Sequence, residues 1–150
     1  MLFLGTDALK AAESQSGFSL LLLHVIRLES TEMNIRHAAS IYFKNLIMNN
    51  WVPDEGETDI FSLEDRNTIK QHIIQLMLTL PHLLQAQLHH ALAIISTTDF
   101  PRNWTNLLPE LMSYLSSDDY THITSVLETF NYMFHKYRVQ GNAYIHPQLF

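Results

Sequence analysis

Apolar residues recur along this chain at the spacing of one helix face, with polar residues between them. The clearest stripe spans residues 32–50, where Arg36 and Lys44 lie off the apolar face. Its members are Ile35, Ala38, Ala39, Tyr42, Phe43, Leu46 and Ile47. This spacing predicts one long amphipathic helix, which ends before Pro53 because proline cannot continue a helix.

Other segments repeat the same pattern. Ser62 stands three residues before Asp65, as in a capping box, and predicts the start of a helix over 63–80 that Pro81 ends. Further stripes predict helices over 7–13, 18–28, 82–95, 104–115 and 119–138. No segment alternates apolar and polar residues over the length of a strand, so we predict an all-α chain.

The predicted helices alternate with short turns and have similar lengths, which is typical of helical hairpins stacked side by side. The predicted pairs are 7–13 with 18–28, 32–50 with 63–80, and 82–95 with 104–115, while 119–138 begins a fourth. We therefore predict an α-solenoid of about three and a half HEAT-type hairpins, similar to an armadillo-repeat superhelix. A hairpin at the end of such a stack leaves an apolar face uncovered.

Composition and charge restrict the function. The 150 residues suffice for one compact unit, and 4 Gly and 5 Pro argue against a turn-rich β protein. The formal net charge is -6 and the nine Lys and Arg residues are scattered, so we expect no nucleic-acid binding. The absence of cysteine excludes disulfides and thiol nucleophiles. The chain start lacks the basic region and long apolar run of a secretory signal, so we expect a soluble, intracellular protein without membrane insertion.

No sequence motif of an enzyme is present. The four glycines form no nucleophile elbow, phosphate loop or dinucleotide-binding fingerprint, so we predict neither catalysis nor a cofactor. The nine histidines show no metal-binding spacing, and the adjacent His89 and His90 diverge on a helix, so we expect solvated or capping histidines and no metal site. Trp51 and Trp104 lie at helix ends and are predicted to pack in the core, and Arg36 is predicted to be structural.

Several short motifs resemble the amino-terminal region of the importin-β (karyopherin-β) family, in which an Ile-Arg-x-Ala helix runs into Lys-Asn and Trp. The motifs are Gly17-Phe18, Ile35-Arg36-x-Ala38-Ala39, Phe43-Lys44-Asn45, Asn50-Trp51, Asp99-Phe100-Pro101-x-x-Trp104 and His135-Lys136-Tyr137-Arg138. The later motifs are most similar to the branch of the family that re-exports importin-α. The resemblance predicts importin-β-like HEAT repeats over 1–138 and a divergent tail over 139–150, without the family's leading helix.

The resemblance implies the amino-terminal part of a nuclear transport receptor. Such a receptor binds the GTP form of the small GTPase Ran, carries importin-α as cargo, meets nuclear pore proteins, and shuttles between nucleus and cytoplasm. In the family the second helix of each hairpin lines the concave surface that Ran contacts, which here gives 18–28, 63–80 and 104–115. The candidate Ran contacts are an apolar stripe of Leu21, Val25 and Leu28, and a polar rim of Asn67, Lys70, Gln71 and Gln75.

Other interpretations stay open at this point. A stacked neighbouring helix could cover the apolar stripe instead of a partner. The chain could also be a generic helical-repeat scaffold, another import receptor of the family, or a small histidine-dependent hydrolase. Binding that depends on the nucleotide state of Ran separates the transport function from the scaffold, and metal content or an activity that titrates near neutral pH would support the hydrolase.

Overall fold

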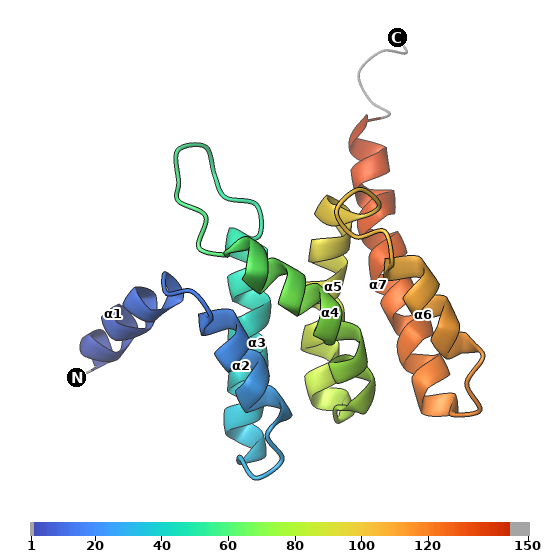
Figure 1. Ribbon diagram of the computed structural model, residues 1–150, viewed down its shortest axis with the longest axis horizontal. Helices are drawn as coiled ribbons and strands as arrows, with labels where there is room; N and C mark the ends of the chain where they lie inside the picture. The colour runs from blue at the N-terminus through green and yellow to red at the C-terminus, as the bar shows by residue number, and fades with distance from the viewer. Residues whose placement is uncertain (1, 145–150) are drawn as a thin grey trace.

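The computed structural model describes residues 2–144, with side chains over 5–138, and contains seven α-helices in that range (Figure 1). They are α1 (Leu2–Glu13), α2 (Phe18–Arg27), α3 (Met33–Asn50), α4 (Leu63–Thr79), α5 (His82–Asp99), α6 (Leu107–Leu115) and α7 (Tyr120–Tyr144). No strand occurs in 2–144. The predicted all-α fold is therefore confirmed.

The helix boundaries follow local sequence signals. The Ser62 hydroxyl accepts a hydrogen bond from the Asp65 backbone N–H at 3.0 Å, so the predicted cap at the start of α4 is present. Helix α6 begins at Leu107 rather than at residue 104, which places Pro109 in its first turn. Backbone N–H groups in the first turn have no acceptor within the helix, so a proline there costs no hydrogen bond. Helix α5 continues past the predicted end at residue 95 as far as Asp99.

The helices form two layers. In Figure 1, α2, α4 and α6 lie in front and α3, α5 and α7 lie behind. The rear helices pack extensively, α3 on α5 and α5 on α7, whereas the helices of the front layer are more widely spaced. Grooves can therefore open between the helices of the α2/α4/α6 layer.

The closest antiparallel neighbours are α2 with α3, α4 with α5, and α6 with α7. They are joined by the short turns 28–32, 80–81 and 116–119 at the lower edge of Figure 1. This pairing is shifted by one helix from the predicted pairs, because the longer connections 51–62 and 100–106 separate α3 from α4 and α5 from α6. Short turns hold consecutive helices together, and longer connections do not.

One hydrophobic core runs through the whole stack. Its fully buried members come from α2 to α7 and include Ile26, Phe43, Ile47, Ile69, Ile73, Leu88, Leu92, Ile95 and Val126. Each such side chain contributes about 1.5–3 kcal/mol by burial. Trp51 and Trp104 are 2% and 6% exposed, so their predicted place in the core is confirmed. A continuous core shared between neighbouring hairpins is what makes a solenoid stable.

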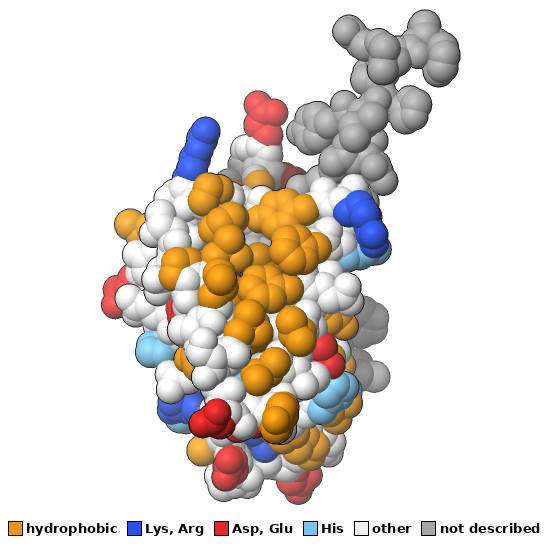
Figure 2. All heavy atoms as spheres, turned by 90° about the vertical axis from the view of Figure 1, so that its right-hand side faces the viewer, with side chains coloured by type: hydrophobic (Ala, Val, Ile, Leu, Met, Phe, Trp, Pro, Cys, Tyr) orange, Lys and Arg blue, Asp and Glu red, His pale blue; other side chains and the backbone are white. Residues whose placement is uncertain are grey.

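The α6/α7 end of the stack carries an uncovered apolar face, which Figure 2 shows as a contiguous patch. Met112 of α6 and Leu127 and Phe134 of α7 are each more than half exposed. The ring of Phe134 stacks on the partly buried Phe130 at a centroid distance of 5.9 Å. We call Met112, Leu127, Phe130 and Phe134 the α6/α7 end face; its exposure confirms the prediction of an open terminal hairpin.

Candidate partner-binding face

Two grooves lie on the α2/α4/α6 layer. The α2/α4 groove has a volume of about 430 Å³, and the α4/α6 groove has a volume of about 260 Å³. The outward side of α4 separates them, because Gln75 lines the first groove while Asn67 and Gln71 line the second. The predicted contact helices thus form one surface with two depressions.

Only part of the predicted apolar stripe on α2 is exposed. Leu21 is 57% exposed and Leu28, just beyond the end of α2, is 42% exposed, so both are available to a partner. Val25 is only partly exposed and packs against the core. Packing within the chain therefore covers part of Val25, whereas Leu21 and Leu28 face outward.

The predicted polar rim on α4 is also exposed only in part. Asn67, Gln71 and Gln75 are exposed and follow one another along the outward side of the helix. Lys70 is only 9% exposed, and its ammonium group points into the protein. As placed, Lys70 supports this surface from inside, and its predicted contact with a partner stays untested.

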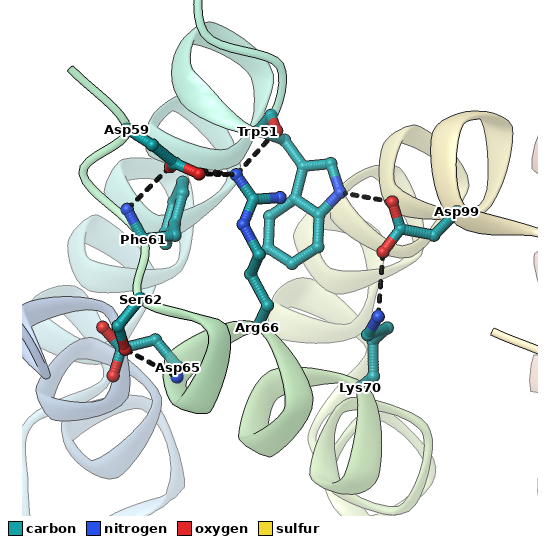
Figure 3. A network of polar contacts seen from close by, with 8 residues as sticks. All are labelled: Trp51, Asp59, Phe61, Ser62, Asp65, Arg66, Lys70 and Asp99. Carbon is teal, nitrogen blue, oxygen red and sulfur yellow. Dashed lines mark hydrogen bonds and ion pairs between the residues drawn. The ribbon is translucent and has the colours of Figure 1, made fainter. Parts of the chain in front are cut away.

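Lys70 belongs to a polar network at the junction of α3, α4 and α5 (Figure 3). Its Nζ donates to Asp99 Oδ2 at 2.9 Å and to the Asn103 carbonyl oxygen at 2.9 Å. The other Asp99 oxygen, Oδ1, accepts from Trp51 Nε1 at 3.2 Å. Asp99 thus joins the end of α3 to the middle of α4, a role that sequence spacing did not indicate.

Arg66 fixes the connection 51–62 against α4 (Figure 3). Its guanidinium donates to the Asp59 carboxylate at 2.9 Å and to the Trp51 carbonyl at 3.0 Å. It also stacks over the Trp51 ring at 4.4 Å from the ring centroid and lies 5.5 Å from that of Phe61. The long connection is therefore held in place although it contains no helix.

Two further buried groups orient α2. Arg36, 6% exposed, donates from Nε to the Ile26 carbonyl at 2.8 Å near the end of α2, which confirms its structural role. Asp65, 4% exposed, accepts from the Gly17 backbone N–H at 3.2 Å. Gly17 has φ 86°, a left-handed conformation that favours glycine. Both ends of α2 are thus anchored, and this anchoring fixes the position of Leu21.

His89 corrects the prediction of solvated histidines, because its side chain is 1% exposed between α5 and α7. Burial lowers the pKa of His89 from 6.5 to about 4, and the Glu128 carboxylate 3.8 Å away only partly opposes that effect. His89 Nε2 has no hydrogen-bond partner among the described residues. The apolar residues around His89 on α5 gave no signal that distinguished it from the exposed His90.

Two other kinds of site, a metal centre and a membrane span, are absent from the described residues. Within 2–144, no group of three or more His, Cys, Asp or Glu side chains is arranged to hold a metal ion. The helices described there include none that is both long and apolar enough to cross a membrane. The α2/α4/α6 layer is the candidate functional surface because it carries the two grooves and the exposed residues described above.

A solenoid of stacked helical hairpins with an exposed, grooved layer has the architecture of a protein-binding repeat protein. Residues 5–79 match the importin-beta N-terminal domain, and the chain belongs to that family. Its fold resembles that of the solved exportin Cse1 in its cargo-free, cytoplasmic state, with a TM-score of 0.80 and 37% identity over 89% of this chain and 14% of that one.

Curated relatives are named for export. The importin-alpha re-exporter of Schizosaccharomyces pombe is 40% identical over 133 residues, which cover 88% of this chain and 14% of the relative. Exportin-2 of Drosophila melanogaster is 39% identical over 88% of this chain, and human exportin-2 is 38% identical over 87%. This chain spans about one seventh of the length of these relatives, from 13% to 14%.

Proposed function

We propose that this chain supplies a Ran-binding surface of a nuclear transport receptor that takes part in the export of importin-α. The observation that carries the proposal is the exposure of Leu21 and Leu28 on the same layer as the polar, uncharged side of α4. An apolar centre with a polar rim is the usual composition of a protein-binding surface. The names of the relatives support export as the process.

The proposed contacts with GTP-bound Ran are Leu21, Val25 and Leu28 on the α2 side and Asn67, Gln71 and Gln75 on α4. Lys70 acts through its pair with Asp99, which holds α4 in position beside α5. We assign the chain no catalytic role, and its net charge of -6 argues against nucleic acid as the ligand.

We further propose that the receptor shuttles between nucleus and cytoplasm, with importin-α as cargo and nuclear pore proteins as transient partners. The importin-β-like repeats are proposed to cover 1–138, with 139–150 as a divergent tail. Helix α7 runs on to Tyr144, and the rest of the proposed tail lies outside the described residues. Which helix layer is concave in a longer receptor stays a prediction.

A calorimetric titration with Ran in its two nucleotide states tests the proposal. GTP-loaded Ran should bind in preference to GDP-loaded Ran, with a Kd of about 1 µM or weaker, because this chain forms only part of the interface. Leu21→Asp should abolish binding. Leu83→Asp is the matched control, because Leu83 is 50% exposed on α5, in the other layer. Equal binding of the two nucleotide states would leave only a generic helical scaffold.

A further inference from the structure

The α2/α4 groove combines an apolar floor with a positively charged rim. Leu23 of α2 and Leu76 of α4 are 7% and 8% exposed and form the floor together with Leu20. Its volume of about 430 Å³ is within the range of pockets that hold small ligands or a few side chains. An apolar side chain of a partner would therefore find a complementary surface there.

The rim carries the basic side chains of the groove. His24 and Arg27 line the groove from α2, and His72 lines it from α4. None of the described residues that line it is an Asp or a Glu. In a chain with a formal charge of -6, a groove lined by Arg27 and by no carboxylate has a local charge opposite to that of the whole chain.

Arg27 differs from the buried and half-buried cations of the same layers. Arg36, Arg66 and Lys70 are engaged with a carbonyl or a carboxylate of this chain. Arg27 is exposed, and its guanidinium forms neither an ion pair nor a hydrogen bond with the residues whose side chains are described, 5–138. Its guanidinium keeps its donors for a group from outside, and carboxylates are the side chains that match its geometry.

We propose that the α2/α4 groove binds an acidic segment of a partner protein, with an apolar side chain on the leucine floor and a carboxylate against Arg27. A nucleic acid fits less well, because the floor is apolar and the rim holds only one permanent positive charge. Gln75 and Thr68 supply neutral hydrogen-bonding groups beside the charge. This inference goes beyond the proposed contact with Ran, because it assigns the ligand chemistry of the groove whichever protein supplies the segment.

Fluorescence anisotropy with a defined peptide probes this groove. The probe is a short fluorescein-labelled peptide in which leucines are flanked by glutamates, and the comparison peptide has glutamine in place of each glutamate. The full chain should bind the glutamate peptide, and binding should weaken as salt screens the charges. The glutamine peptide should bind about tenfold more weakly.

Charge-reversal variants locate the site. Arg27→Glu and His72→Glu should each weaken binding of the glutamate peptide, by about tenfold for Arg27→Glu, because the new carboxylate repels the ligand. Arg138→Glu is the matched control, since Arg138 is exposed on α7 and does not line the groove. Circular dichroism checks that each variant keeps its helicity.

Equal binding of the two peptides, or equal effects of Arg27→Glu and Arg138→Glu, would overturn the assignment of the groove. The titration with GTP-loaded Ran separates this result from the proposed function. Binding of Ran without glutamate-dependent peptide binding removes only the groove proposal. If the chain does not bind Ran but binds the glutamate peptide, and Arg27→Glu weakens that binding, the groove proposal is supported and the proposed Ran contact is removed.

Discussion

The ammonium group of Lys70 lies 2.9 Å from Asp99 Oδ2, and the two side chains are 10% and 7% exposed. The pair joins the middle of α4 to the last residue of α5. Both charges are removed from water, so each is stabilised by the opposite charge of the other. The Trp51 N–H also donates to Asp99, and the Asn103 carbonyl accepts from Lys70. The outward side of α4, with Gln71 and Gln75, is therefore positioned by a buried ion pair.

Removal of the Lys70 charge should destabilise the fold. Lys70→Met leaves Asp99 buried without its cation, and we expect the free energy of unfolding to fall by about 3 kcal/mol in urea denaturation. The additional change Asp99→Leu should restore part of that loss, because no unpaired charge then remains. Lys136→Met is the control, since Lys136 is exposed. A loss below about 1 kcal/mol for Lys70→Met would show that solvent reaches the pair.

Trp51 should act as a core residue and not as a partner anchor. Its ring is 2% exposed, donates to Asp99 and lies under the Arg66 guanidinium. Trp51→Ala should therefore lower the free energy of unfolding by about 3–5 kcal/mol through lost burial and a cavity. Val52→Ala, at a position that is 60% exposed, should have little effect on stability.

Partner binding by Trp51→Ala distinguishes the two roles. If the ring is purely structural, the folded fraction of the variant should bind GTP-loaded Ran as the parent chain does. A variant that kept its melting temperature and lost binding would identify Trp51 as an anchor.

The amphipathic pattern allowed most of the fold to be predicted, because helix ends coincide with local signals such as Ser62, Pro53 and Pro81. The predicted antiparallel pairing was wrong, because helices were paired in order from the first one and the lengths of the connections, short at 28–32 and 80–81 and long at 51–62, were not used. The candidate site was predicted in part. Leu21 and Gln71 are exposed as expected, but Lys70 is buried in a pair with Asp99. The two residues are 29 positions apart on different helices, so the periodicity of one helix could not indicate the pair.

His89 should make the fold sensitive to acid. Its pKa is lowered from 6.5 to about 4, so below pH 6.5 the unfolded chain takes up a proton that the folded chain does not bind until about pH 4. The free energy of unfolding should therefore fall as the pH drops through this window, by on the order of 3 kcal/mol at most. Burial also lowers the pKa of His90, which acts in the same direction.

The variant His89→Leu isolates this effect. Since Nε2 has no partner, replacement by an apolar side chain leaves no group unpaired, and stability at pH 7 should change by less than about 1 kcal/mol. The difference in stability between pH 7 and pH 4.5 should become smaller than in the parent chain. Urea denaturation at several pH values measures both quantities, and an unchanged pH dependence would show that His89 is accessible to protons in the folded state.

The α6/α7 end face should cause self-association. Leu127 and Phe134 are 55% and 63% exposed, and Figure 2 shows that the apolar side chains at this end are contiguous. Contiguous apolar surface of this kind is favourably removed from water, so sedimentation velocity should show oligomers whose fraction increases with protein concentration.

The double variant Leu127→Glu and Phe134→Glu should shift the chain toward monomer without loss of helicity, because neither side chain is buried. Met48→Glu is the control, as Met48 is 54% exposed on α3, away from this end. A parent chain that stays monomeric at all concentrations, or a double variant that associates like the parent, would show that this face is not adhesive on its own.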